Sequence, residues 1–243
     1  MTQLIIGWDK PEWSREDAAL IHALKPHCAM LKFGAEQRDR RDSRFGISFS
    51  LLHAFMRDCE HAEMPVMLDF KESQTADTMS RVFANLPWGA IRIVTIDGNV
   101  SGRCLSEAAS CCREHDAQLA AVTIKTDMDD AECQAIYGCD AKTAALRLAR
   151  RAKLFGAHGV VIPGPFVRDA RREGILDDDN FFSIVAGIRM PGEHPGNHVW
   201  PVTPEDVAET QATHAVVQSS IWNSEDPVAI AETIFQTLQP RAA

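Results

Sequence analysis

The sequence lacks several features, and each absence excludes a class of protein. No apolar run approaches the roughly 18–20 residues that a membrane helix needs, and the segment from Met1 to Gly7 lacks the basic region and long apolar stretch of a signal peptide. Positive charge is also scarce, because 25 lysines and arginines stand against 34 aspartates and glutamates, a net charge of −9. A protein that binds a phosphate backbone needs clustered basic side chains. We therefore expect a cytoplasmic protein that binds neither membranes nor nucleic acid.

Metal-ligand spacing is missing as well. None of the seven cysteines forms a CxxC pair. His194 and His198 lie four residues apart, but in a stretch rich in proline and glycine, where we expect solvated loop histidines. Cys111 and Cys112 are neighbours in an apparent helix. A vicinal redox pair is the alternative to small buried thiols in a reducing compartment, which we favour. We expect no metal site.

The composition that remains is that of an ordinary globular protein. The chain has 243 residues, of which 45% are hydrophobic and 24% charged. This composition excludes disordered, collagenous and coiled-coil proteins. The length suits two small domains or one α/β barrel, a fold that commonly has about 250 residues.

Short apolar segments recur about every 30 residues, which is the length of a βα unit with its connection. Their apolar residues are consecutive rather than alternating, as in Val66-Met67-Leu68, and this pattern is typical of strands buried on both faces of a parallel sheet. The predicted strands are residues 4–9, 28–34, 65–71, 90–97, 118–125, 157–163, 182–189 and 213–219.

Helical patterns fill the intervals between these strands. Ser14 to Asp17 fits a capping box before a helix, and residues 141–155 carry one apolar face and end at Gly156. Thr203 and Asp226 each precede a proline, as expected of helix N-caps. Eight βα units without a linker predict a single-domain (β/α)8 TIM barrel over residues 1–243. The alternative is a doubly wound open sheet, but no glycine-rich dinucleotide loop supports it.

Polar side chains stand at or just beyond most of the predicted strand ends. In barrels of this kind the active site lies at the carboxyl ends of the strands. Each such residue could instead simply mark the point where a strand becomes a loop. The candidates are Asp9, Lys32, Asp69, Lys71, Asp97, Lys125, Asp127, Arg189, Gln218 and Ser219.

Asp69 and Lys71 are the strongest of these candidates. Residues i and i+2 of a strand face the same side, so both are expected to point into the barrel mouth, where Lys32 of the preceding strand can join them. Charges sheltered from water are costly unless they are paired. Two ammonium groups that share one carboxylate suit proton transfer to a carbanion. One ammonium group donates the proton, and the other stabilises the anion.

The same residues carry a family resemblance that covers essentially the whole chain. Leu68-Asp69-Phe70-Lys71, followed by Thr78, resembles the Asp-x-Lys-x-x-Asp signature of the orotidine 5′-phosphate decarboxylase superfamily. Further similar stretches follow in the family's order: Leu31-Lys32-Phe33-Gly34, Ala121-Val122-Thr123-Ile124, Gly159-Val160-Val161, Gly187-Ile188-Arg189, Thr203-Pro204 and Asp226-Pro227.

The resemblance implies a (β/α)8 barrel, a homodimer with two active sites at its interface, and decarboxylation without a cofactor. It implies that Lys71 protonates the carbanion, that Lys32 and Asp69 hold the charge network, and that Asp9 contacts sugar hydroxyls. The other candidate substrate-binding residues are Asp97, Thr123, Asp127, Arg189, His198, Gln218 and Ser219.

The charge network departs from the family pattern at one position. The family's second catalytic aspartate, which is donated across the dimer, is replaced by Gln74, and the nearby Asp77 belongs to a different position. Two lysines and one aspartate leave one net positive charge. The site therefore attracts a substrate carboxylate more strongly, and destabilises it less, than the neutral family set of two lysines and two aspartates. The related 3-keto-L-gulonate 6-phosphate decarboxylases have a metal-binding glutamate where this chain has Lys32, so we expect no magnesium.

The phosphate-binding positions differ too. Asn197-His198 stands where the family has Asp-Gln, and Gln218-Ser219 stands where it has Gly-Arg. These differences remove a glutamine and an arginine that hold phosphate, and a charge-assisted hydrogen bond contributes roughly 1.5–3 kcal/mol. Asp97 replaces the histidine usual at the end of the fourth strand.

Three hypotheses about function follow. The first is a decarboxylase of this superfamily that acts on a different small-molecule carboxylate, nucleotide-like but not necessarily phosphorylated. The second is orotidine 5′-phosphate decarboxylase proper, in pyrimidine biosynthesis, with compensating residues such as Asp77 or Arg189. The third is a non-catalytic barrel that binds a ligand, which is disfavoured because an unused buried charge cluster reduces stability.

Overall fold

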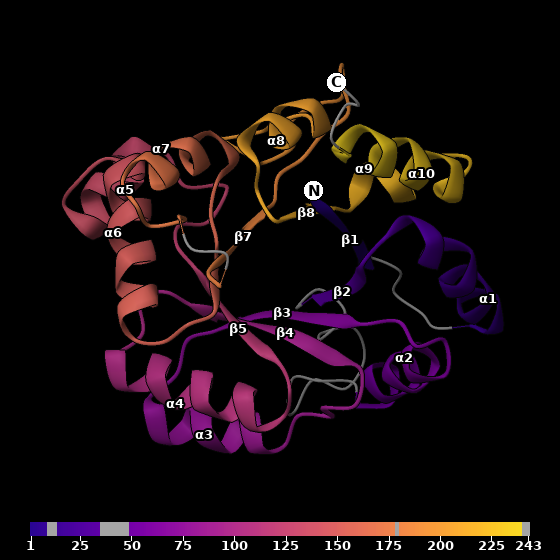
Figure 1. Cartoon of the computed structure of the whole chain (residues 1–243), viewed down its shortest axis with the longest axis horizontal. Helices are drawn as coiled ribbons and strands as arrows, with labels where there is room; N and C mark the ends of the chain where they lie inside the picture. Colours follow the sequence, from indigo (N-terminus) through magenta and orange to yellow (C-terminus); the bar gives the residue numbers. More distant parts are fainter. Residues whose placement is uncertain (9–13, 35–48, 178–179, 240–243) are drawn as a thin grey trace.

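Parallel strands alternate with helices and close into a barrel (Figure 1). The computed structural model describes residues 1–8, 14–34, 49–177 and 180–239. Every strand pairs in parallel with the next, and β8 pairs back onto β1 through Ile6 and Val217. The strands are β1 (Gln3–Trp8), β2 (Met30–Gly34), β3 (Val66–Glu72), β4 (Ile91–Asp97), β5 (Gln118–Val122), β6 (Gly159–Val161), β7 (Phe182–Val185) and β8 (His214–Val217).

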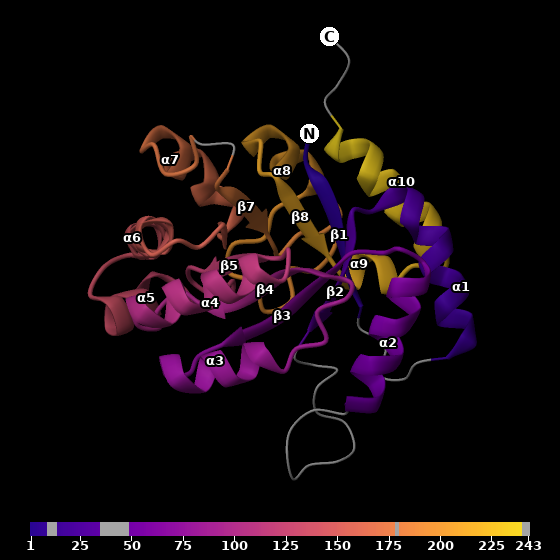
Figure 2. The same cartoon turned by 60° about the horizontal axis from the view of Figure 1, so that its bottom comes forward.

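Helices surround the barrel, with α1, α2 and α10 on one side and α5, α6 and α7 on the other (Figure 2). No helix in the described part of the chain is long and apolar enough to cross a bilayer. The α-helices are α1 (Arg15–Leu24), α2 (Phe49–His61), α3 (Ala76–Ala84), α4 (Gly102–Glu114), α5 (Asp130–Tyr137), α6 (Ala141–Leu154), α7 (Val167–Arg172), α8 (Pro204–Thr210), α9 (Ser219–Trp222) and α10 (Pro227–Leu238), and two 3-10 helices are η1 (Lys25–His27) and η3 (Gly164–Phe166).

The predicted barrel is confirmed, and the predicted strands match the observed ones, most of them extending past the observed carboxyl ends. The predicted caps are also present. The Ser14 hydroxyl accepts from the Asp17 N–H, and Thr203 and Asp226 cap α8 and α10. Gly156, which follows α6, adopts a left-handed φ of 83°. The assignment of the full range 1–243 to one domain stays a prediction.

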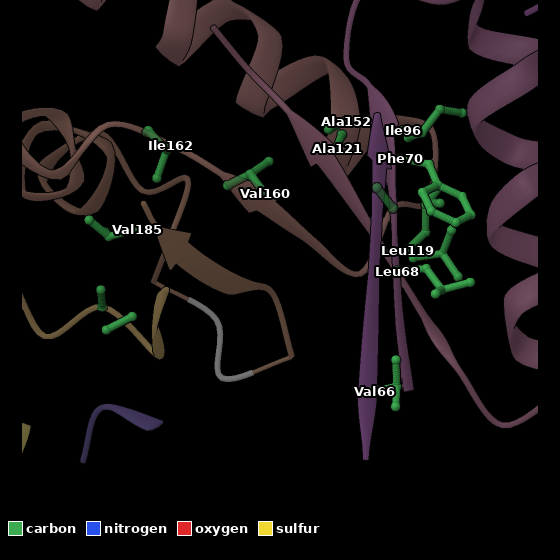
Figure 3. Packing of buried hydrophobic residues seen from close by; sticks show 14 of the residues in the cluster. Val66, Leu68, Phe70, Ile96, Leu119, Ala121, Ala152, Val160, Ile162 and Val185 are labelled. Carbon is green, nitrogen blue, oxygen red and sulfur yellow. The ribbon is translucent and has the colours of Figure 1, made fainter. Parts of the chain in front are cut away.

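Two hydrophobic layers hold the barrel together, because successive side chains of a strand face opposite sides. Met67 of β3 points into the barrel interior with Ile5, Ile93 and Val216. Val66, Leu68 and Phe70 lie on the other side of β3, in the layer between strands and helices (Figure 3). Consecutive apolar residues are therefore required, as the sequence indicates, since both faces of each strand are buried.

The cysteines belong to this packing. All seven thiols are free, and Cys28, Cys59, Cys104, Cys112 and Cys133 are buried. Burial raises the pKa of Cys28 and of Cys112 to about 12. A thiol that stays protonated is a poor nucleophile, so the geometry favours small buried thiols over a vicinal redox pair.

His214 of β8 provides a test of the barrel's stability. Burial lowers its pKa to about 4, while a backbone hydrogen bond with Ser183 opposes the shift. The unfolded chain, with a histidine pKa near 6.5, therefore binds more protons between these two values. We expect the free energy of unfolding to fall by about 3 kcal/mol between pH 6.5 and 4 relative to His214→Gln, measured by urea titration. The exposed His22→Gln is the control, and identical pH profiles for wild type and His214→Gln would contradict the assignment.

Candidate active site

Two lysines share one carboxylate oxygen at the mouth of the barrel. Lys71 Nζ lies 2.6 Å from Asp69 Oδ2, and Lys32 Nζ lies 3.3 Å from the same atom. Thr95 Oγ1 of β4 donates to the other carboxylate oxygen, Asp69 Oδ1, at 3.0 Å. The structure thus brings the three predicted residues together and adds a threonine to them. We call these four residues the charge cluster.

The charge cluster is largely buried, which makes its pairing energetically important. Asp69 and Lys32 are each 8% exposed, whereas the side chain of Lys71 is 39% exposed. Burial acts to raise the pKa of Asp69, but the positive charges of Lys32 and Lys71 and the hydrogen bonds from Lys71 and Thr95 outweigh it and lower this pKa. Asp69 is therefore an anion that faces the cavity.

A bulge in β3 gives the cluster its geometry. The β3–β4 register shifts between the pairs Leu68–Val94 and Glu72–Ile96, so β3 has more residues than its partner over this stretch. Within it Lys71 adopts a left-handed φ of 50°. Its N–H donates to the Thr95 side chain, Oγ1, at 3.0 Å. Bulges near active sites typically change the direction of a side chain. Here the bulge contains Lys71, whose ammonium group contacts Asp69.

The cluster opens into a cavity of about 560 Å³, which we call the main cavity. Four cations and two carboxylates line it, so its formal charge is positive although the whole protein is acidic. Many of the predicted residues lie on its wall: Lys32, Asp69, Lys71, Lys125, Asp127, Arg189, His198, Gln218 and Ser219.

A smaller cavity of about 210 Å³ adjoins the main one, and we call it the side cavity. Lys71, Val122 and Lys125 line both cavities, so the two share this wall. The predicted residues Asp97 and Thr123 line the side cavity only, and the Thr123 hydroxyl donates to the Val161 carbonyl at 3.0 Å.

Three predicted or alternative positions lie elsewhere. Asp9 is outside the described residues. Gln74 is exposed between β3 and α3 and is not among the described residues that line either cavity. Asp77 is an exposed ion-pair partner of Arg103, at 3.1 Å. Neither Gln74 nor Asp77 therefore extends the charge cluster within a single chain.

The segment 188–200 after β7 forms one side of the main cavity and is tied to the loop after β5. His198 Nδ1 lies 2.7 Å from Thr126 Oγ1, the Val199 N–H donates to the Thr126 carbonyl, and the Trp200 indole donates to the Met128 carbonyl. Burial and the charge of Arg189 lower the pKa of His198, against the opposing effect of Asp127. His198 is therefore a neutral, oriented ring at neutral pH.

Thr95, Asn99 and Tyr137 belong to the site but were not predicted from the sequence. Thr95 carries no charge, although it precedes Asp97 by two positions and so shares its face of β4. Asn99 and Tyr137 of the side cavity come from a loop and from α5, and no strand-end pattern indicates them. Across residues 1–8, 14–34, 49–177 and 180–239, no three histidine, cysteine or acidic side chains gather as a metal-ligand group.

The fold and the charge cluster together define an α/β-barrel enzyme with its active site at the carboxyl ends of the strands. The family described as orotidine 5′-phosphate decarboxylase / HUMPS matches residues 2–234, and the chain belongs to this family. It is accordingly an enzyme of the decarboxylase type.

Curated relatives carry the family's name, and solved structures share the fold. The chain is 28% identical to an orotidine 5′-phosphate decarboxylase of Novosphingobium aromaticivorans over 90% of its length and 92% of the relative's. It is 28% identical to that of Alcanivorax borkumensis, with 97% of each chain covered. The fold resembles the crystal structure of the Lactobacillus acidophilus enzyme, with a TM-score of 0.77, 21% identity, and 99% and 100% of the two chains covered. It also resembles the enzyme of Methanocaldococcus jannaschii in complex with the inhibitor BMP, with a TM-score of 0.71, 16% identity, and 99% and 100% coverage.

Proposed function

We propose that the protein decarboxylates orotidine 5′-phosphate without a cofactor, and that Lys71 supplies the proton. The observation that carries this proposal is the Lys71 ammonium 2.6 Å from the buried Asp69 carboxylate, at the open end of the barrel. The names of the relatives favour this substrate over the non-standard carboxylate of our first hypothesis. The non-catalytic barrel receives no support from these names.

In the proposed reaction, the bond between the pyrimidine carbon and the carboxylate carbon breaks, CO₂ leaves, and the electron pair stays on the ring carbon. The Asp69 anion repels the substrate carboxylate, and the nearby Lys71 cation stabilises the carbanion that replaces it. Lys71 Nζ then donates its proton to this carbon and forms the C–H bond. Because 39% of the Lys71 side chain is exposed, its amine can regain a proton from solvent. Lys32 holds Asp69 in its ionised form.

The charge of the main cavity supports an anionic substrate. Lys125 and Arg189 line it and form no ion pair with any residue in the described segments. Orotidine 5′-phosphate carries a phosphate in addition to its carboxylate, and these two cations are available to a second anionic group. We propose Arg189, His198 and Ser219 as substrate contacts on this wall.

One observation favours the first hypothesis, a different carboxylate, as the second candidate. Gln218 lies across β1, where a Cβ atom on Gly7 would come within 2.4 Å of Gln218 Oε1. The Gln218 side chain therefore occupies space at the edge of the main cavity that the family's glycine would leave open. This favours a substrate whose group at that edge is smaller than a phosphate or is neutral.

Turnover of two related carboxylates by the purified protein distinguishes the two candidates. The proposal expects orotidine 5′-phosphate to be converted to uridine 5′-monophosphate, followed by ultraviolet absorbance and CO₂ release, and it expects the gene to restore growth of a uracil auxotroph. Faster turnover of the unphosphorylated nucleoside orotidine supports the second candidate. If folded protein releases no CO₂ from either compound, the proposed substrate is wrong.

The homodimer remains part of this proposal. Gln74 is exposed at the carboxyl end of β3 and does not reach the cavities of its own chain, so it is available to a second copy. Sedimentation velocity measures the oligomeric state, and a monomer with full activity would exclude a shared active site.

A further inference from the structure

Glu193 has no role in the steps proposed so far, although its contacts adjoin the main cavity. Its carboxylate oxygen Oε2 accepts two hydrogen bonds, one from the Ser220 hydroxyl and one, at 2.8 Å, from the Met190 N–H. Ser220 is only 4% exposed and directly follows Ser219, which lines the main cavity. Met190 comes after β7 and Ser220 after β8. Glu193 therefore joins the segments that follow these two strands.

A tight turn holds the Glu193 carboxylate in this position. The Glu193 N–H donates to the Met190 carbonyl at 3.0 Å, and Gly192 between them has a φ of 86°. Proline followed by glycine with a positive φ is typical of a type II turn, and Pro191 stands before Gly192. The turn therefore places the carboxylate on its two donors before any ligand arrives.

These two donors lie where a (β/α)8 barrel commonly binds an anion from solution. Phosphate groups in such barrels are frequently held by the loops after strands 7 and 8, and a hydroxyl and a backbone N–H are donors that suit them. In this protein, a carboxylate of the chain itself occupies both donors. Glu193 forms no ion pair with the residues that the structure describes. Its negative charge therefore opposes a second anion at this place.

We infer that Glu193 is a specificity-determining residue, which competes with the phosphate group of a substrate for the Ser220 hydroxyl and the Met190 N–H. The inference rests on the proposed function for the identity of that substrate. A phosphate must either displace the Glu193 carboxylate or bind without these donors, and both alternatives weaken its binding. A substrate without a phosphate leaves the Glu193 contacts intact.

Calorimetric titration with uridine 5′-monophosphate and with uridine tests the competition. Because Glu193→Ala removes a negative charge and frees two donors, we expect it to bind the nucleotide about 10- to 100-fold more tightly than wild type. Its affinity for uridine should stay within about twofold of wild type, since uridine has no phosphate. Glu193→Gln removes the charge but keeps an acceptor, so its gain should be smaller. Glu232→Gln, an exposed site on α10 with the same change of charge, is the control and should match wild type.

A double variant and the kinetics separate competition from a purely structural role of Glu193. Adding Ser220→Ala to Glu193→Ala removes the contested hydroxyl, so part of the gained affinity for the nucleotide should disappear. In decarboxylation of orotidine 5′-phosphate, Glu193→Ala should lower KM and leave kcat unchanged, because the phosphate is remote from the reacting carbon. A loosened loop would instead weaken both ligands.

The outcomes separate this inference from the proposed function. If Glu193→Ala weakens uridine and its monophosphate equally, or leaves the ratio of their affinities unchanged, Glu193 only fastens the loop and the inference is wrong. Protein that releases no CO₂ from orotidine 5′-phosphate, but binds uridine 5′-monophosphate more tightly after Glu193→Ala, refutes the proposed function and supports the inference. If neither wild type nor Glu193→Ala binds either ligand, both are wrong.

Discussion

Lys71→Ala is expected to lower kcat for decarboxylation by at least roughly 10³-fold, because it removes both a general acid and a cation next to the carbanion. The protein should still fold, since the Lys71 side chain is 39% exposed and Asp69 keeps Lys32 as a partner. The measurement is CO₂ release under saturating substrate, with circular dichroism to verify folding.

Lys71→Arg separates the two roles of this residue. A guanidinium keeps the positive charge but hardly gives up a proton, so we expect substrate binding to be largely retained and kcat to remain low. The control is Lys142→Ala on the exposed side of α6, which should match wild type. If Lys71→Ala retains kcat within about tenfold of wild type, below the usual contribution of a general acid, Lys71 is not the proton donor.

Asp69→Asn is expected to lower the free energy of unfolding by about 3–5 kcal/mol, because it leaves the buried Lys32 ammonium without a counter-charge. Lys32 is only 8% exposed, and within the described segments Asp69 is its one ion-pair partner. Urea unfolding measures the loss. The exposed ion pair of Asp177 with Lys153 provides the control, and Asp177→Asn should cost less than about 1 kcal/mol.

A double variant shows whether charge imbalance causes this loss. Lys32→Met combined with Asp69→Leu removes both buried charges, so stability should return while activity stays absent. If Asp69→Asn alone unfolds at the wild-type urea concentration, the cluster has no structural importance.

The same cluster sets an acid dependence. The pKa of Asp69 in the folded protein is below its ordinary value of 3.8. The ionised carboxylate therefore contributes stability above this pH, and the contribution is lost as pH falls through the folded pKa.

Much of the fold is predictable from local pattern, because short segments contain the signals. Consecutive apolar residues indicate strands that are buried on both faces, and capping residues indicate where helices begin. The predicted ends were less accurate. Residues 118–125 were predicted as one strand, but β5 ends at Val122, and Thr123 to Lys125 already belong to the loop that lines the cavities. Apolar residues continue past the strand here because the loop is itself partly buried, so composition does not mark its end.

The charge cluster was predictable because Asp69 and Lys71 stand near the end of a predicted strand and Lys32 lies on the strand before it. The bulge was not, because Lys71 has a left-handed φ without being glycine or asparagine. Tyr137 reaches the site from α5 through tertiary packing, which no local pattern encodes. The exposure of Gln74 likewise depends on the turn after β3 rather than on residue type.

The left-handed backbone at Lys71 places the protein's stability and its chemistry in opposition. A non-glycine residue in this conformation costs of order 1–3 kcal/mol, which the surrounding packing must offset. Thr95 helps to do so by accepting the Lys71 N–H. Substitutions that relax β3 into a regular strand should therefore raise the melting temperature and move the ammonium group off Asp69. Selection for heat resistance alone would favour such variants, whereas selection for growth that depends on the enzyme's activity would retain the bulge.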